Sequence, residues 1–440
     1  MFGQPRSLLL LSSTEMWERF SFYGMRAILV LYMVGKLADG GLGWSRQESL
    51  ILYGNYTMSV WLAPLVGGYL ADRFLGQRLA IYIGCIIIST GHFLLAFQSL
   101  GFFYSGLTCL VVGTGFFKPC VTSILGGLYS ENDPKRDAGY SIFYMGINIG
   151  AFFGGIMTGW LQMRYNFHVA FAAAGFAMFI AFGLFVFTKR YLGKVGLRPV
   201  KKVENEIPKE PLTPQEKKRV GMIFILAMIT VLFFVAYEQG GGMLTIFTDQ
   251  FTDRHFFGWE IPTSWLAGSL NPLFIVILAP VLSALWSKLA KNKKDISVVA
   301  KMAVGFAVTG LSFFLLIAPT RIVEADPSSK VSLAWLVTFY GLYTVGELLV
   351  VPLLWSMVSR IAPQRYLSVL MGVMLASAGL GCKLAGWVGS FIDAKGPSQI
   401  FSGIMITMFA FALLCMVVNK GLMRWASLKE ADLVAQPKTN

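Results

Sequence analysis

The sequence is poor in charged residues and in the side chains that bind metals or form disulfides. Asp, Glu, Lys and Arg make up 14% of the 440 residues, whereas soluble domains contain about 25%. The histidines and cysteines are scattered, without CxxC or metal-ligand spacing: His92, His168, His255, Cys85, Cys109, Cys120, Cys382 and Cys415. No nucleophile–base arrangement stands out either. We therefore expect no enzyme, no metal site and no cofactor.

Apolar sequence dominates instead. The chain is 55% hydrophobic and has a mean hydropathy of +0.63, and a membrane span needs ~20 mainly apolar residues. These features predict an all-α, polytopic membrane protein. Run lengths and turn signals place twelve spans, at 13–37, 49–71, 78–99, 103–127, 138–162, 167–190, 219–247, 266–288, 297–319, 332–358, 367–392 and 399–423. The first run has charges at its centre and no small-residue cleavage site, so we expect a retained helix.

The formal net charge of +14 lies mostly in loops, which favours contact with anionic lipid over nucleic acid. The positive-inside rule then places both termini in the cytoplasm. A basic, proline-containing connector at 191–218 divides the chain into six spans plus six. We expect a first bundle at 1–190, a cytoplasmic linker at 191–218, a second bundle at 219–423 and a cytoplasmic tail at 424–440. Two such halves are typical of transporters with a midplane site.

Eight ionisable side chains interrupt the apolar runs. Charges at membrane depth cost from ~2.5 to more than 10 kcal/mol each, so they rarely persist without a task. The four acids and four bases sum to zero, which favours mutual pairing: Glu15, Glu18, Arg19, Arg26, Lys118, Glu238, Glu347 and Lys383. The alternative is that each side chain reaches an interface. That alternative suits Glu15 better than Lys118, which follows a long apolar stretch.

Glu347 lies deep in its span, and a buried carboxylate binds a proton more readily alone than beside a cation. A glutamate that gains and loses a lysine partner would therefore gain and lose a proton, as proton coupling requires. Gly146, Gly150 and Gly154 recur every four residues. Small residues at this spacing predict close packing between membrane helices.

Two motifs carry a family resemblance. The stretch Gly67-Gly68-Tyr-Leu-Ala71-Asp72-Arg73-Phe-Leu-Gly76-Gln77-Arg78 suits a latch between helices and resembles the major facilitator superfamily. Glu15-x-x-Glu18-Arg19-Phe20-x-Phe22-Tyr23-Gly24 resembles the ExxERFxYYG signature of the proton-dependent oligopeptide transporter family. Further matching stretches follow in family order around Lys118, Asn148, Glu238, Asn271 and Glu347.

The resemblance implies a proton-coupled symporter that imports di- and tripeptides by alternating access between two six-helix bundles. It implies proton coupling by Glu15, Glu18, Arg19, Lys118 and Glu347. It implies salt bridges for Lys118 with Glu347 and for Arg26 with Glu238, and Asp72 and Arg73 are expected to act in gating as part of the latch. Peptide-contacting positions would be Arg26, Lys118, Asn148, Asn271, Glu347, Glu238, Tyr23, Tyr56, Trp61 and Phe234.

We expect a protein of the plasma (inner) membrane whose partners are peptides, protons and lipid, without an obligate protein partner. The sequence departs from the family pattern at Phe22, Trp61, Phe234 and Val351, and two helices that many bacterial members carry between the halves are not evident. These departures bear on side-chain preference. The alternatives are transport of nitrate, a modified peptide or a drug-like solute, or a non-transporting membrane receptor.

Overall fold

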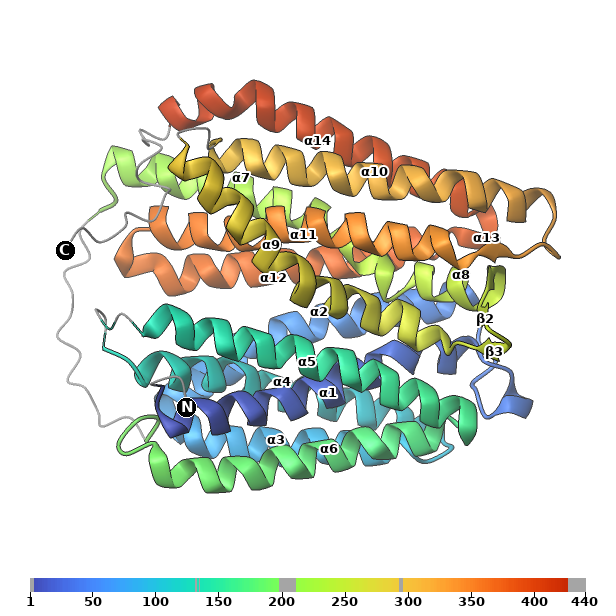
Figure 1. Ribbon diagram of the computed structural model, residues 1–440. Helices are drawn as coiled ribbons and strands as arrows, with labels where there is room; N and C mark the ends of the chain where they lie inside the picture. The colour runs from blue at the N-terminus through green and yellow to red at the C-terminus, as the bar shows by residue number, and fades with distance from the viewer. Residues whose placement is uncertain (1–3, 131–132, 134, 198–210, 293–295, 426–440) are drawn as a thin grey trace. The chain divides into compact units, whose positions relative to one another are not determined.

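A computed structural model describes residues 4–130, 133, 135–197, 211–292 and 296–425 (Figure 1). The described residues are mostly helical. The helices of the first half are α1 (Arg6–Val34), α2 (Arg46–Leu70), α3 (Gln77–Leu95), α4 (Leu100–Gly127), α5 (Arg136–Arg164) and α6 (Phe167–Thr188). Those of the second half are α7 (Pro214–Tyr237), α8 (Met243–Phe251), α9 (Leu270–Lys291), α10 (Val298–Ala325), α11 (Leu333–Ile361), α12 (Leu367–Gly389), α13 (Ile392–Lys395) and α14 (Pro397–Trp425).

Each of the twelve expected spans corresponds to a long helix. Within the described residues, ten helical segments are long and apolar enough to cross a membrane. The other two long helices are α1, which carries the charged motif, and α2. Some helices extend past the expected bounds. α1 begins at Arg6 rather than at 13, and α10 ends at Ala325 rather than at 319. The seventh span contains a short 3₁₀ turn, Glu238–Gly240, between α7 and α8.

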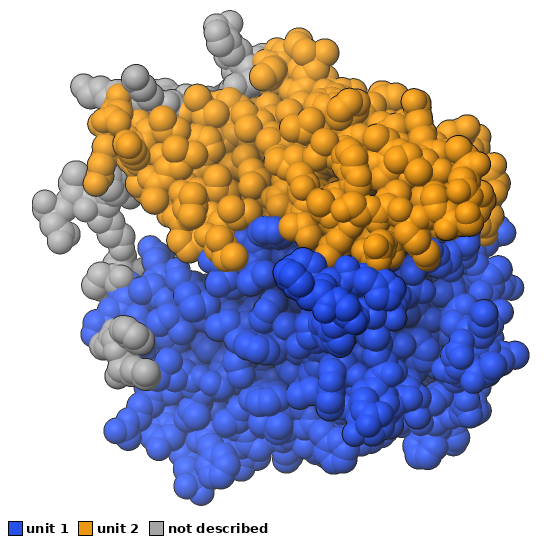
Figure 2. Space-filling model, turned by 45° about the vertical axis from the view of Figure 1, so that its right-hand side comes forward, with its two compact units in different colours: residues 1–205, 240–250, 254–276 blue, residues 206–239, 251–253, 277–440 orange. Residues whose placement is uncertain are grey.

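Contacts divide the chain into two compact units. Unit 1 contains residues 1–205, 240–250 and 254–276, and unit 2 contains residues 206–239, 251–253 and 277–440 (Figure 2). The expected domain boundaries follow the sequence more simply than this, and they stay a prediction. Much of the expected linker, and all of the tail from 426 onward, lies outside the described residues.

In unit 1, α1 packs against α5 and α6, while α4 packs against α2 and α3 (Figure 1). Glycine allows the closest of these contacts. A Cβ atom on Gly150 would lie 2.1 Å from the carbonyl oxygen of Met16, and one on Gly154 would lie 2.3 Å from that of Phe20. The backbones of α1 and α5 therefore touch, which confirms the packing role predicted for these glycines.

In unit 2, α10 packs against α11 and α14, and α7 packs against α12. Capping explains where α7 begins. Pro214 occupies its first turn, and the Thr213 hydroxyl and Glu216 carboxylate form a reciprocal capping box. The last residues of the expected linker are therefore helical. A parallel pair of short strands, β1 (Thr252–Asp253) and β4 (Val331–Ser332), also belongs to unit 2.

A hairpin in unit 1 precedes the eighth span. Strands β2 (His255–Phe256) and β3 (Trp259–Glu260) are antiparallel. Phe257 and Gly258 form the turn at φ of 49° and 78°, the positive values that a two-residue type I′ turn requires. Arg254 fastens the base of the hairpin, because its Nη2 lies 2.7 Å from Glu260 Oε1.

Candidate functional site

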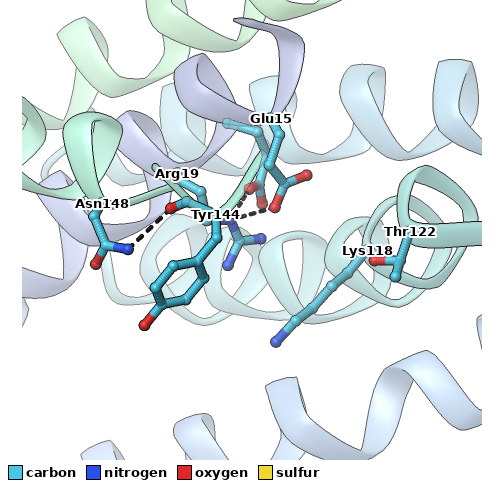
Figure 3. A network of polar contacts seen from close by, with 7 residues as sticks. Glu15, Arg19, Lys118, Thr122, Tyr144 and Asn148 are labelled. Carbon is cyan, nitrogen blue, oxygen red and sulfur yellow. Dashed lines mark hydrogen bonds and ion pairs between the residues drawn. The ribbon is translucent and has the colours of Figure 1, made fainter. Parts of the chain in front are cut away.

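The charged motif of α1 forms a buried cluster (Figure 3). Glu15, Glu18 and Arg19 are 4%, 1% and 4% exposed. The Nε atom of Arg19 lies 3.1 Å from Glu15 Oε1, one helical turn away, and it also donates to the Glu18 carboxylate. Two acids therefore share one guanidinium. The sequence prediction that these three residues act together is consistent with this geometry.

Several polar atoms of this cluster lack hydrogen-bond partners. Glu15 Oε2, Glu18 Oε1 and Arg19 Nη2 are buried and have no hydrogen-bond partner among the described residues. A buried polar atom without a partner costs about 1–3 kcal/mol, and more when it is charged. A cluster with one excess carboxylate and spare acceptor atoms is suited to bind a proton.

Arg26 lies two turns further along α1 and is held by aromatic rings. Its Nε donates to the Tyr53 hydroxyl at 2.7 Å, and its Cζ lies 5.7 Å from the Tyr53 ring and 5.9 Å from the Tyr23 ring. Tyr23 was expected at the site, but Tyr53 was not. Tyr56 was expected; it is buried, and its hydroxyl has no hydrogen-bond partner in the described part of the chain.

Lys118 contacts one of the residues that depart from the family pattern. Its Nζ lies 4.4 Å from the centroid of the Trp61 ring, a cation–π distance. Figure 3 shows the lysine projecting from α4 on the side where Arg19 and Tyr144 also lie. Trp61 therefore offers this ammonium a ring face. This contact lies within unit 1 and was not predicted from the sequence.

The two predicted asparagines both belong to unit 1. Asn148 lies on α5, where its Nδ2 donates to the carbonyl oxygen of Tyr144 at 2.9 Å (Figure 3). This bond fixes the orientation of the side-chain amide. Asn271 lies at the start of α9 and is half-buried. Both can hydrogen-bond a polar solute through an amide oxygen.

Unit 2 contributes buried acids. Glu238 is 2% exposed and Glu347 is 8% exposed. Tyr237, which precedes Glu238, stacks on Tyr343 of α11 with ring centroids 5.7 Å apart, and the Tyr343 hydroxyl donates to the Tyr237 carbonyl. These contacts tie the end of α7 to the helix that carries Glu347.

Two further positions in unit 2 complete the predicted set. Phe234, predicted as a pocket residue, is 3% exposed and packs on Tyr237. Lys383 is exposed on α12, unlike the buried acids Glu238 and Glu347. The predicted pairs Lys118–Glu347 and Arg26–Glu238 join side chains of different units, and they stay predictions.

The residues of the predicted latch form hydrogen bonds with several different partners in unit 1. Gln77 donates to Asp72 at 3.4 Å and to Ser123 of α4 at 2.6 Å. Arg73 donates to the Tyr69 hydroxyl at 2.9 Å. Arg78 instead binds the chain after α6, donating to the carbonyl oxygens of residues 193 and 195 at 2.6 and 2.7 Å. This last arginine therefore anchors the start of the connector, a role that the motif did not indicate.

Sequence reasoning also missed a buried polar link between three helices. The Ser21 hydroxyl of α1 donates to the carbonyl oxygen of Ala174 on α6 at 2.8 Å. The same hydroxyl lies 2.6 Å from Nε2 of His92 on α3. His92 is fully buried. Within the described residues, no group of three or more His, Cys, Asp or Glu side chains could hold a metal ion.

Comparison with known proteins gives consistent matches along the chain. A family model described as the POT family matches residues 78–206 and 200–402. The peptide transporter YePEPT of Yersinia enterocolitica is 33% identical over 455 residues, covering 89% of each chain. Dipeptide and tripeptide permease A of Escherichia coli is 29% identical over 492 residues, covering 99% of this chain and 96% of the permease.

Solved structures agree with these matches. A mutant of the peptide transporter POT in complex with alafosfalin is 31% identical and superimposes with a TM-score of 0.88, covering 97% of this chain and 96% of that one. A POT family transporter in complex with a thioalcohol-conjugated peptide is 27% identical, with a TM-score of 0.87 and coverage of 96% and 98%.

Proposed function

Because this chain belongs to the POT family of membrane transporters, we propose that it is a proton-coupled symporter that imports di- and tripeptides by alternating access. The relatives named above as peptide transporters support the substrate class. The single observation that carries the mechanism is the buried Glu15–Arg19–Glu18 cluster. A charged cluster of this kind at membrane depth is costly, and proton coupling gives a reason for its presence.

The charged residues suit a zwitterionic cargo. A peptide carries a carboxylate at one end and an ammonium at the other, and charge-assisted hydrogen bonds recognise both. We assign the carboxylate to Arg26 and Lys118, which aromatic rings already orient. We assign the ammonium to Glu347, with Asn148 and Asn271 as amide partners.

The remaining predicted site positions are the walls and partners of this pocket. Tyr23, Tyr56, Trp61 and Phe234 provide ring faces that tolerate varied peptide side chains. Glu238 is proposed as the partner of Arg26, while Asp72 and Arg73 are proposed to latch neighbouring helices.

Coupling follows from competition for the same charges. Glu15 and Glu18 share Arg19, and the proposed partner of Glu347 is Lys118. Protonation of Glu347 releases Lys118 to bind the peptide carboxylate, and the protonated Glu347 still has an oxygen that can accept a hydrogen bond from the peptide ammonium. Release of the peptide restores the pair and expels the proton. A pair that never separated would only cost stability.

The available energy is sufficient. One proton moved across 100 mV yields ~2.3 kcal/mol, and one pH unit adds ~1.4 kcal/mol. The sum, ~3.7 kcal/mol, supports roughly 500-fold accumulation per proton at 1.4 kcal/mol per decade.

The chain is an integral membrane protein. We propose the plasma (inner) membrane as its location, with both termini in the cytoplasm, because the basic loops and the connector share one side of the expected topology.

Uptake into liposomes with an imposed pH gradient tests the proposal. We expect Lys118→Ala and Glu347→Ala to abolish concentrative uptake of labelled dialanine. Lys383→Ala is the matched control, because it removes a lysine that is exposed on α12, and it should transport normally. Concentrative uptake by either site variant at normal expression would refute the assignment.

The same assay separates other substrates. Competition of dialanine uptake by nitrate, modified peptides or drug-like solutes would identify a transporter of another solute. If the purified protein bound peptide but moved none under a pH gradient, it would be a receptor rather than a symporter.

A further inference from the structure

The motif helix has two faces of opposite character. Glu15, Glu18 and Arg19 are almost fully buried, whereas Met16, Trp17 and Phe20, in the same turns, are partly exposed. An apolar face turned outward, behind charges turned inward, is expected where lipid surrounds the helix. The outward face of α1 therefore meets a different environment from the proton-binding face.

The outward face borders a groove of about 600 Å³ between α1 and α5. Its lining consists of Met, Trp, Phe, Ile and Gly side chains, including Met16, Trp17, Phe20 and Trp160. Ligand sites commonly have volumes of about 300–1,000 Å³. The groove is therefore large enough for a ligand, and its lining suits one without polar groups.

The groove is built by close backbone packing. Gly150 and Gly154 bring α5 against the backbone of α1, and the larger side chains beside them line the groove. Trp265, at the start of the turn before α9, also lines it. Its Nε1 donates to the Ile156 carbonyl oxygen at 2.8 Å, and Ser269 donates to that of Phe152 at 2.9 Å. These hydrogen bonds fix the shape of the groove.

The groove opens onto exposed apolar side chains of α5. Phe153, Met157 and Trp160, which line it, are 53%, 45% and 45% exposed. On a membrane-spanning helix, apolar side chains this exposed contact hydrocarbon. The occupant with access to the groove is therefore a lipid tail, and a lipid tail also matches its apolar lining.

We propose that this groove binds one acyl chain of a bilayer phospholipid, directly behind the charged motif of α1. The chain would pack on Met16, Trp17 and Phe20 and so support the rotation of α1 that keeps Glu15, Glu18 and Arg19 inward. The structure thereby places a lipid-binding site on the helix that we assign to proton coupling.

Photolabelling in vesicles tests this proposal without any need for transport. The protein is reconstituted in phosphatidylethanolamine and phosphatidylglycerol with a small fraction of diazirine-tailed phosphatidylethanolamine, and labelled peptides are identified by mass spectrometry. The reference surface is α6, where Phe176 and Phe179 are 62% and 51% exposed. We expect labelling at Phe153 and Met157 to exceed it about tenfold, equivalent to ~1.4 kcal/mol of preference.

Groove-filling variants supply the control. Ile149→Trp and the rim variant Met157→Trp should reduce labelling of the groove and leave labelling of α6 unchanged, whereas Phe179→Trp on α6 should leave the groove unaffected. Equal labelling of groove and α6 in the wild type would show an ordinary lipid-facing surface and overturn the proposal. So would unchanged groove labelling in both filling variants. Failure of peptide uptake would leave the labelling result unaffected.

Discussion

Gly150→Ala tests how closely α1 must lie against α5. The added methyl carbon would lie 2.1 Å from the Met16 carbonyl oxygen and 3.1 Å from the Phe20 nitrogen. Real Cβ contacts essentially never fall below 3.0 Å, so the helices must separate by about 0.9 Å (3.0 − 2.1). Both neighbours are backbone atoms that cannot rotate away. Overpacking of this kind costs about 1–3 kcal/mol.

Gly183→Ala is the matched control, because a Cβ at Gly183 on α6 meets nothing within 4 Å. Both variants gain the same helix propensity, up to ~1 kcal/mol in soluble helices, so the difference between them isolates the packing cost. Denaturant titration of the purified protein should place Gly150→Ala about 1–3 kcal/mol below Gly183→Ala in unfolding free energy. Proton-driven uptake should fall as well, since the displaced turn carries the charged cluster. Equal stability of the two variants would refute the reasoning.

Three further predictions concern single hydrogen bonds. Tyr53→Phe removes the acceptor of Arg26 and should raise the KM for dialanine about tenfold, a loss of ~1.4 kcal/mol; an unchanged KM would exclude this contact from peptide binding. Ser21→Ala should lower the unfolding free energy by about 1–3 kcal/mol, and a titration that shows no loss would contradict the buried link. Hydrogen bonds from the hydroxyl and N–H of Ser328 lower the pKa of Asp326. Its stabilising contribution is thus present above the unfolded pKa of about 3.9 and lost as pH falls below it. Asp326→Asn should remove that part of the acid sensitivity, measured by melting temperature against pH.

The sequence was sufficient to locate the long helices, because apolar run length and charge position are local properties. Ends were harder. α1 starts at Arg6 although Ser12, Ser13 and Thr14 lower the local hydropathy, and these residues are tolerated because α1 packs inside unit 1. The β2–β3 hairpin depends on a positive φ at Phe257. A residue other than glycine gives no sequence signal for a positive φ.

The site was predictable by residue type more than by contact. The family resemblance identified Arg26, but its hydrogen bond to Tyr53 was not predicted, because it depends on the rotation of α2, which sequence spacing leaves open. Arg78 illustrates the same limit. Its motif suggested a latch, whereas its actual partners are backbone carbonyls after α6. Every residue has a backbone carbonyl, so the sequence does not indicate which one an arginine will bind. Lys383 followed apolar sequence and was still exposed, because one side of α12 faces outward.

The serine–histidine contact between α1, α3 and α6 also fixes a tautomer. The Ser21 hydroxyl has one hydrogen and donates it to the carbonyl oxygen of Ala174. The hydrogen bond between Ser21 and His92 must therefore be donated by Nε2 of the imidazole. Nδ1 is buried and has no hydrogen-bond partner among the described residues, so a proton there would leave an unpaired charge in the interior. Sliding any one of the three helices would break an ordered donor–acceptor chain in a dry interior. These helices are therefore expected to travel as one block during the transport cycle.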